Sequence, residues 1–485
     1  MSRVSTQAQL SRGALPAGVQ RALELLDRLL GSSPGWVVGG ALRDALLGEP
    51  VAELDVAVSA GAIALGRAMA QAAPGSGFVV LDEERGMCRV LSDVHVDIAD
   101  LRGPDLGTDL RRRDFTVDAL AASLHDLARR GDAAIEDATG GLADLAARTI
   151  RPCGPDAVAD DPVRALRGVR LAIRPGWHLH ASAEAAIKSA APRLGEVAAE
   201  RVRAELAAIL ADAKAAVGLR LLDRLEALPV LLPESLAMRS TTQPEPHRFD
   251  VWEHSLRAVE AADEMLADLG WLEPYSAELA AHLAEPIGDG FTRREALKLA
   301  ALLHDVAKPE RKSLQEGRIR FFGHDVVGAE RAAAIARRWR LSRRATAIVE
   351  RLVAQHLRPM HLGNAGGISR RARYRFFRDL GSEARDLVLL AIVDAAAVRG
   401  DAPASVWRGP GGVILQELMR GVGEERQAAS AAPLLRGEDV MEAFALAPGP
   451  EIGRLLTQAR EAQALGLVVT PREALEYLRR RAASA

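Results

Sequence analysis

The feature that most constrains this fold is a short apolar strand that ends in two glycines and is followed by a helix and an acidic strand. Residues 36–44 read WVVGGALRD and residues 53–58 read ELDVAV. Alternate side chains of a strand share a face, so Glu53 and Asp55 are expected to project together while their neighbours enter the core. Two carboxylates on one rigid strand suit two Mg²⁺ ions, so both are predicted catalytic metal ligands.

The turn between the strand and the helix suits the phosphates of a nucleotide. Gly39 and Gly40 let the backbone approach phosphate closely, and helix-terminal N–H groups point at such an anion. Arg43 adds a fork of hydrogen-bond donors for the phosphate oxygens. We therefore predict a cradle for a triphosphate. The alternative is an ordinary strand, turn and helix with solvated acids, because short motifs also match by chance.

A third acid and a run of arginines extend this hypothesis. Asp97 lies in VHVDIAD at 94–100, an alternating apolar strand, and is the expected third acid of the catalytic set. Residues 109–121 read DLRRRDFTVDALA and are expected to open an apolar helix. The side chains that would clamp phosphates there are Arg111, Arg112 and Arg113. The alternative is the solvated, charged start of a helix.

A further group of residues suits the edge of a nucleobase. Asp161, Arg164 and Arg167 fall at helical spacing in DDPVRALR at 160–167, which we predict to be helical. Asp161 can accept a hydrogen bond from an exocyclic amine while Arg164 donates to the neighbouring ring nitrogen. Cytosine and adenine satisfy this pattern, whereas uracil and guanine would leave buried polar groups unpaired. The alternative is a surface ion pair, which stabilises little.

Composition is that of an ordinary globular protein with several domains. The chain of 485 residues is too long for one core, and its net charge of −2 leaves nucleic-acid contact to local basic patches. Two cysteines, Cys88 and Cys153, cannot build a disulfide framework or a cysteine-rich zinc site. No stretch reaches the roughly 18 apolar residues of a membrane span, so we expect a cytoplasmic protein without membrane contact.

Periodicity predicts an α+β fold, with a small mixed-sheet head followed by a mostly helical body. Four parts are expected: a head at 1–150, a helical neck and body at 151–240, a His-rich metal-binding domain at 241–405 and a C-terminal helical region at 406–485.

The His-rich part carries residues that suit a metal-dependent hydrolase. The candidate ligands of one cation are His254, His304, Asp305 and Asp394. His324 and His356 could serve a second metal or the phosphate, and Lys308 could neutralise charge. Mixed imidazole and carboxylate ligands suit manganese, iron, nickel, cobalt or zinc, and a bound water would become the nucleophile for a phosphoester. The alternative is a domain that keeps the fold without a functional metal site, in which the buried histidines only form hydrogen bonds with neighbouring groups.

Taken together, the segments of the first half resemble the bacterial tRNA nucleotidyltransferase and poly(A) polymerase family, the class II CCA-adding enzymes. The matching motifs, in the family's order, are VVGGALRDALLG, ELDVAV, RRRDFTVDALA, GGLADLAARTIR, DDPVRALRGVRLA and AAERVRAEL. The resemblance implies that Asp161 and Arg164 select CTP and ATP, and that Asp114 joins the preceding arginines in binding the ribose and triphosphate.

Two residues depart from that family's pattern. Glu53 stands where aspartate is usual and carries its carboxylate one methylene further out, whereas Mg²⁺ tolerates little deviation from octahedral geometry. Asp118 stands where asparagine is usual and adds negative charge near the phosphates. Triphosphate binding should weaken unless a cation compensates this charge.

The histidines and acids of the second half resemble the HD phosphohydrolase domain, in the version fused to bacterial CCA-adding enzymes. The resemblance makes His254, the His304–Asp305 pair and Asp394 the metal ligands. It implies phosphatase or phosphodiesterase action on terminal or 2′,3′-cyclic phosphates of tRNA ends.

Two arginine-rich stretches with aromatic residues, 337–344 and 370–378, suit RNA contact, although amphipathic helices with core aromatics are favoured slightly. Arg193, Arg201 and Arg203 lie nearer the expected path of the tRNA acceptor stem.

The resemblance thus implies an enzyme that adds C and A to the tRNA 3′ end from CTP and ATP, with Mg²⁺ in the head and a divalent transition metal in the HD domain. Alternatives within the class are a poly(A) polymerase, against which the HD series weighs, and an enzyme that adds only CC or only A. An alternative of another class is an HD phosphohydrolase whose head binds RNA but has lost transfer. Glu53 and Asp118 keep that last alternative open.

Overall fold

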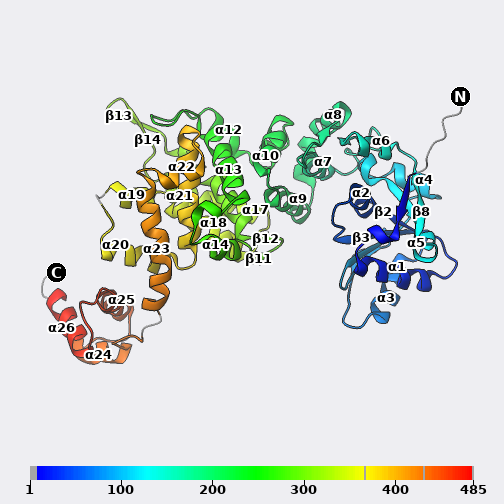
Figure 1. The fold of residues 1–485 in the computed structure, drawn as a ribbon. Coiled ribbons are helices and arrows are strands. Elements are labelled where there is room, and N and C mark those ends of the chain that lie inside the picture. The colour runs from blue at the N-terminus through cyan, green and yellow to red at the C-terminus, as the bar shows by residue number, and fades with distance from the viewer. Residues whose placement is uncertain (1–7, 365–366, 430–431, 483–485) are drawn as a thin grey trace. The chain divides into compact units, whose positions relative to one another are not determined.

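The computed structural model describes residues 8–364, 367–429 and 432–482. The chain divides into two compact units (Figure 1). The head unit contains residues 1–205 and 221–231, and the helical unit contains residues 206–220 and 232–485. No helix in the described ranges is long and apolar enough to cross a membrane. The finer division into four parts stays a prediction.

An eight-stranded mixed sheet forms the centre of the head unit, in the order β1-β8-β7-β2-β3-β6-β5-β4. β3 and β6 are parallel, and the other neighbouring strands are antiparallel. The strands are β1 Gln9–Ser11, β2 Gly35–Val38, β3 Glu53–Val58, β4 Gly77–Asp82, β5 Met87–Leu91, β6 His95–Asp100, β7 Leu120–Ser123 and β8 Asp132–Asp137. The expected α+β fold is confirmed, and β2, β3 and β6 follow the predicted strands closely.

The helices of the first 231 residues are α1 Ala17–Leu30, α2 Gly40–Leu47, α3 Ala62–Ala72, α4 Leu106–Arg111, α5 Leu124–Arg129, α6 Gly141–Ala146, α7 Arg164–Ala172, α8 Ala181–Ala190, α9 Ala199–Ala211, α10 Ala215–Arg224 and α11 Leu228–Leu231. A small parallel pair, β9 Thr149–Ile150 and β10 His178–Leu179, lies between them in sequence. Helices α9 and α10 lie partly in the helical unit, which contains residues 206–220.

The prediction of a helix opening within 109–121 is wrong. The arginines end α4, a 3₁₀ turn follows at Thr116–Asp118, and Leu120 then begins strand β7. β7 pairs with both β2 and β8, and Leu120, Ala121 and Ala122 are fully buried. A short apolar run of this kind fits a buried strand as well as a buried helix, so periodicity alone could not decide.

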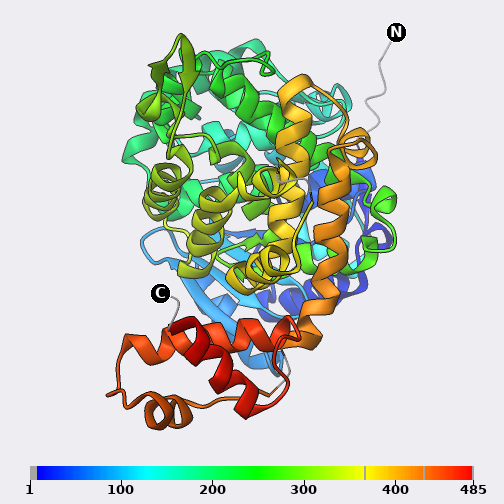
Figure 2. The same ribbon diagram turned by 90° about the vertical axis from the view of Figure 1, so that its left-hand side faces the viewer.

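Helices dominate the second unit. They are α12 Glu234–Arg239, α13 Val251–Ala267, α14 Ser276–Leu283, α15 Arg293–Leu303, α16 Lys308–Arg311, α17 His324–Arg338, α18 Arg343–Gln355, α19 Arg358–Asn364, α20 Arg370–Leu380, α21 Glu383–Arg399, α22 Pro403–Arg408, α23 Gly412–Ala429, α24 Gly437–Phe444, α25 Pro450–Ala464 and α26 Pro471–Ala482. Two hairpins join them, β11 Pro286–Gly288 with β12 Phe291–Thr292 and β13 Ser313–Gln315 with β14 Arg318–Arg320. Helices α13, α15, α18 and α21 pack together, and α21 and α23 run side by side (Figures 1 and 2).

A buried lysine ties residues 206–220 into the helical unit. Lys298 Nζ lies 2.7 Å from Asp263 Oδ1 and donates to the carbonyl of Asp212 at 2.7 Å. The N–H of Ala216 donates to the other Asp263 oxygen at 2.8 Å. The buried ammonium group of Lys298 therefore has a carboxylate and a carbonyl as partners, which offsets the cost of removing it from water.

A second buried charge joins α14, α15 and α21. Arg293 is only 2% exposed, and its Nη1 lies 2.8 Å from Asp386 Oδ2 while its Nε lies 2.5 Å from Glu285. Asp386 also contacts His282 Nε2 at 3.0 Å. Removing the arginine would leave Asp386 buried without its cation.

We expect Arg293→Met to lower the free energy of unfolding of the helical unit by about 3 kcal/mol or more, because a buried carboxylate loses its partner. Urea denaturation followed by tryptophan fluorescence measures this. Arg351→Met is the matched control, because Arg351 is half-exposed and contacts Glu383, which Arg293 also contacts. A loss as small as that of the control would contradict the assignment.

Candidate nucleotide and metal sites

The carboxylates of the head gather on one face of neighbouring strands. Asp55 on β3 pairs directly with Asp97 on β6, and Glu53 lies two residues before Asp55 on the same face. The pKa of Asp55 is raised to about 6, first by burial and then by repulsion from Glu53, while Arg167 and Arg113 oppose the rise. A carboxylate destabilised in this way gains from a hard cation, so the residues fit Mg²⁺.

Glycine at position 39 makes room for this acid. Gly39 lies between strand β2 and helix α2 and has a φ of +73°. A Cβ atom at this position would lie 2.8 Å from Asp55 Oδ2. The same Cβ would lie 3.6 Å from Arg113 Nη1, which places that arginine beside the acid. The next residue, Gly40, begins α2. Any side chain at position 39 would collide with the carboxylate.

An arginine that we did not single out from the sequence holds the third acid. Arg89 on β5 lies opposite Asp97 and donates to both its oxygens, Nε to Oδ1 at 2.6 Å and Nη2 to Oδ2 at 2.7 Å. Its Nη2 is also 3.7 Å from Glu53 Oε2. Within the described ranges, Glu53, Asp55 and Asp97 do not form a cluster with ligand atoms all within 4.8 Å. A metal role for Asp97 stays a prediction.

Arg43 is a buried counter-ion in this structure. Its Nη1 lies 2.5 Å from Asp118 Oδ1, and its Nε and Nη2 donate to the two oxygens of Asp44 at 3.0 Å each. Arg167 Nη2 lies 3.8 Å from the other oxygen of Asp118. Two cations therefore compensate the unusual negative charge at position 118. Contact of Arg43 with phosphate stays a prediction.

Arg167 also pairs with Asp114, its Nε lying 2.9 Å from Asp114 Oδ2. Burial acts to raise the pKa of Asp114, but Arg167, the N–H of Phe115 and further arginines outweigh it, so this pKa is lowered. Arg112 donates to the carbonyl of Arg102, and Arg111 is exposed at the end of α4. Asp114 is thus ionised and pairs with Arg167.

The proposed base-selecting residues have separate partners. The prediction that Asp161 lies on a helix is wrong, because α7 begins at Arg164 and Asp161 precedes it in a turn. Asp161 Oδ2 accepts from Arg201 Nη2 at 2.5 Å, whereas Arg164 Nη1 donates to the carbonyl of Ala157 at 2.8 Å. Arg201 thus holds Asp161 in this structure, and its expected place near the RNA path stays a prediction. Proline at position 162 disfavours helical conformation in the residue before it, Asp161. This proline could have predicted that the helix begins after Asp161, although the spacing of the charged residues suggested an earlier start.

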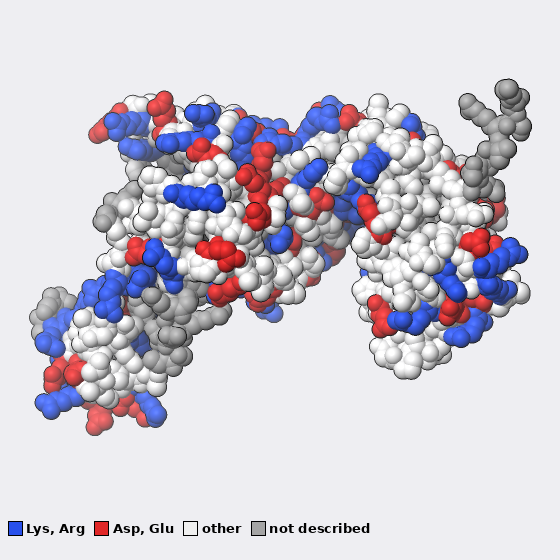
Figure 3. Space-filling view, viewed as in Figure 1, with Lys and Arg blue, Asp and Glu red and all other residues white. Residues whose placement is uncertain are grey.

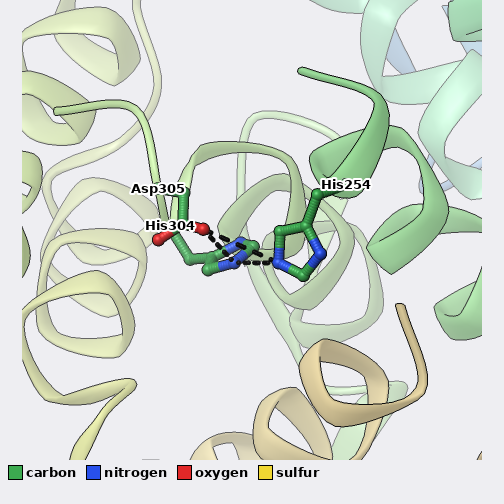
Figure 4. A group of neighbouring side chains, drawn as sticks. All are labelled: His254, His304 and Asp305. Atoms are coloured by element: carbon green, nitrogen blue, oxygen red, sulfur yellow. Dashed lines mark hydrogen bonds and ion pairs between the residues drawn. The ribbon is translucent and has the colours of Figure 1, made fainter. Parts of the chain in front are cut away.

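The helical unit brings the predicted ligands of one cation together. His254 on α13 and His304 at the end of α15 approach with their Nε2 atoms 3.1 Å apart, and Asp394 Oδ1 on α21 lies 3.1 Å from His254 Nε2. Asp305 Oδ2 lies 3.2 Å from His304 Nε2. Figure 4 shows the two rings turned toward each other with Asp305 beside them. Four ligand atoms from three parts of the fold thus converge.

The second oxygen of Asp305 faces two more histidines. His324 Nε2 lies 3.3 Å and His356 Nε2 3.7 Å from Asp305 Oδ1, and the two nitrogens are 3.3 Å apart. Asp305 therefore lies between two groups, each with ligand atoms close enough to share a cation. Lys308 Nζ contacts Asp305 Oδ2 at 2.6 Å. The sequence indicated these residues separately but not the shared carboxylate.

Backbone carbonyls fix the orientation of three rings. The Nδ1 atoms of His304, His324 and His356 lie 2.7–2.9 Å from the carbonyls of the residues three positions earlier. A carbonyl only accepts, so each Nδ1 carries the proton and each Nε2 keeps its lone pair when the ring is neutral. This is the arrangement that a metal ligand requires.

The charges of this cluster also fit a cation. Burial lowers the pKa of His304, but Asp305 and Asp394 outweigh it and raise that pKa to about 10. Burial and the neighbouring His304 lower the pKa of His356 to about 4. The two carboxylates thus hold a proton on one imidazole, and a divalent ion can replace it.

The arginine-rich stretch at 370–378 is largely structural. Phe376 and Phe377 are buried, as the alternative interpretation predicted. Arg371 and Arg375 contact the buried Glu461 on α25 at 2.8 and 2.9 Å. In the other stretch Trp339 is also buried.

Comparison with known proteins agrees with this geometry. Three family models match: Poly A polymerase head domain over 35–106 and 94–151, probable RNA and SrmB-binding site of polymerase A over 176–238, and HD domain over 251–396. Fold and site thus combine a polymerase-type head with an HD unit.

Relatives extend over nearly the whole chain. The A-adding tRNA nucleotidyltransferase of Deinococcus radiodurans is 35% identical over 455 residues, which is 92% of this chain and 94% of that protein. The CC-adding tRNA nucleotidyltransferase of Thermus thermophilus is 36% identical over 91% of this chain and 92% of that protein. The chain belongs to the tRNA nucleotidyltransferase family.

A solved structure shares the fold. The Thermotoga maritima CCA-adding enzyme complexed with tRNA covers 98% of this chain and 99% of its own, with a TM-score of 0.61 and 18% identity.

We expect Mg²⁺ binding by the head to weaken as the pH falls below 6. The pKa of Asp55 is raised to about 6 by burial and by Glu53, so below that pH a proton competes with the cation. The affinity should fall by at most about tenfold per pH unit. Isothermal titration in an Asp305→Asn background measures the head alone. Asp97→Asn should shift the transition to lower pH, and an affinity constant down to pH 5 would contradict the assignment.

Proposed function

We propose that this protein adds C and A residues to the 3′ end of tRNA, using CTP and ATP without a nucleic-acid template. The observation that carries the proposal is the carboxylate pair of β3, Glu53 and Asp55, of which Asp55 lies against the glycine turn at Gly39. Relatives that add nucleotides to tRNA match over nine-tenths of their length. The expected cytoplasmic location fits this activity and stays a prediction.

Glu53 and Asp55 would hold Mg²⁺ in the head. When bound, the ions would promote attack of the tRNA 3′-hydroxyl on the α-phosphate and neutralise the leaving pyrophosphate. Arg113, which lies beside Asp55, is placed to attract the triphosphate. Asp114, which is buried, and Arg167 form an ion pair on this side of the site.

Selection of CTP and ATP would use Asp161 and Arg164. In this structure Arg201 donates a hydrogen bond to the Asp161 carboxylate, and Arg164 donates to backbone carbonyls. A nucleobase with an exocyclic amine offers Asp161 a replacement donor, and its ring nitrogen offers Arg164 a replacement acceptor. At the corresponding positions uracil and guanine present the reverse pattern, a carbonyl acceptor and a ring N–H donor, so they would leave both side chains unpaired.

A second candidate is an enzyme that adds only CC or only A. It is favoured because relatives that span nearly the whole chain, including the two described above, are named for such partial additions. A poly(A) polymerase is less favoured, since the complete HD series is present. A head that has lost transfer is also less favoured, because Arg43 and Arg167 compensate the charge of Asp118.

We expect purified protein with Mg²⁺ to extend tRNAs that lack all or part of CCA and then stop. Radiolabelled CTP and ATP, supplied singly to tRNAs ending before CCA, after C and after CC, separate the candidates. A long A tail would favour the polymerase, and no incorporation would sink every transfer proposal.

In the same assay Asp55→Ala should reduce incorporation to background, because the better buried acid of the metal pair is lost. Glu53→Asp should keep or raise the rate, since it restores the shorter carboxylate. Glu84→Gln is the matched control, an exposed acid in the turn between β4 and β5. Full activity of Asp55→Ala would refute the metal assignment.

We further propose that the helical unit hydrolyses phosphoesters at RNA ends. The support is the convergence of imidazole nitrogens on both oxygens of Asp305. Divalent transition metal ions, when bound, would supply the nucleophilic water. The water oxygen forms a new bond to phosphorus, the ester P–O bond breaks, and the proton of the water passes to the leaving oxygen. Lys308, beside Asp305, is placed to neutralise phosphate charge.

We expect the protein loaded with Mn²⁺, Co²⁺, Ni²⁺ or Zn²⁺ to hydrolyse 2′,3′-cyclic or terminal phosphates. Asp305→Asn should lose metal and hydrolysis together while nucleotide addition persists, because the two sites use separate ligands. Elemental analysis and phosphate release measure this. Asp325→Asn, an acid beside the ligand His324, is the control. Retained metal and hydrolysis in Asp305→Asn would contradict the assignment.

A further inference from the structure

A hairpin leads directly into one residue of the HD cluster. In β13–β14 Leu314 pairs with Ile319, and the chain then passes through Phe321, Phe322 and Gly323 to His324, the first residue of α17. His324 Nδ1 donates to the carbonyl of Phe321 at 2.7 Å. The aromatic turn and the candidate ligand are therefore held together by a hydrogen bond.

The two phenylalanines of this turn have different environments. Phe321 is half-buried, and Lys308 Nζ lies 5.4 Å from the centroid of its ring, which is itself 6.4 Å from that of His324. Phe322 is 62% exposed, and its carbonyl accepts from Arg311 Nε at 2.9 Å. Of all phenylalanines, tyrosines and tryptophans in the described ranges, only Phe322 is exposed.

Basic residues lie close to this phenylalanine in the sequence. The exposed basic residues of the hairpin and its approach are Arg311, Lys312, Arg318 and Arg320. Arg318 and Arg320 lie two residues apart on β14, so they share one face. Figure 3 shows Lys and Arg side chains gathered where Figure 1 labels this hairpin, with acidic side chains among them. Glu316, at the turn of this hairpin, is an exposed acid.

We propose that Phe322, Arg318 and Arg320 bind the single-stranded 3′ end of an RNA whose terminal phosphate is hydrolysed at the HD cluster. An exposed ring provides a stacking face for a base, and cations along a strand suit the phosphates that precede it. The inference rests on the proposed phosphohydrolase function and defines its substrate class. An oligonucleotide end engages both ring and arginines, whereas a mononucleotide lacks the preceding phosphates.

The first test compares hydrolysis of a 2′,3′-cyclic phosphate on a pentaribonucleotide and on a mononucleotide, in the Mn²⁺-loaded full chain. Phe322→Ala should raise KM for the pentanucleotide about tenfold with little change in kcat, because base stacking contributes binding. Hydrolysis of bis-p-nitrophenyl phosphate, which has no nucleobase or RNA backbone, should change less than about twofold.

The second test uses salt. In Arg318→Ala/Arg320→Ala the slope of log kcat/KM against log salt concentration should become shallower by about 1.4 for the pentanucleotide, since two phosphate contacts are lost. Leu314→Ala, 73% exposed on the same hairpin, and Arg472→Ala, exposed at the start of α26, are the matched controls. Neither control should change KM or the slope.

A binding measurement tests the proposed RNA-binding surface independently of the proposed hydrolysis. Fluorescence anisotropy with a labelled pentanucleotide that ends in a 3′-phosphate should show about tenfold weaker binding for Phe322→Ala. If no substrate is hydrolysed but this difference remains, the phosphohydrolase proposal fails and the surface stands. If Phe322→Ala binds normally, the proposal is overturned. Weakening by the arginine variants alone would indicate a general anion surface and would also overturn it.

Discussion

Negative charge concentrated on neighbouring side chains is the constraint on which both sites depend. In the head, Asp55 lies beside Glu53 and opposite Asp97, and its raised pKa reflects burial together with this repulsion. In the helical unit Asp305 and Asp394 hold the pKa of His304 far above its usual range. Cations therefore stabilise both places, and basic side chains nearby provide some of this positive charge.

The internal cations explain how the head tolerates its unusual residues. Arg89 neutralises Asp97 and approaches Glu53, and Arg43 and Arg167 enclose Asp118. An extra carboxylate would ordinarily destabilise a site for anions. Here Arg43 and Arg167 lie beside Asp118, and Arg89 lies near Glu53. The departures from the family pattern are thus local rearrangements of charge rather than evidence that the site has decayed.

Local patterns predicted those parts of the fold that local sequence determines. The glycine turn, the β3 carboxylates and the two α13 and α15 histidines were found because alternation, glycine pairs and ordered motifs are readable along the chain. The strand at Leu120 was missed because its burial comes from two neighbouring strands. The Arg89–Asp97 pair and the bridging position of Asp305 were missed because strand register and helix packing bring together residues that no spacing relates.

The division of the chain into its compact units limits how this protein can be taken apart. Residues 206–220 belong with the helical unit, where Lys298 and Asp263 hold them, whereas residues 221–231 return to the head. The backbone thus passes between the units three times. Cleavage at any single peptide bond deprives at least one unit of a segment or leaves it attached to part of the other. The two units are therefore not separable end-to-end modules.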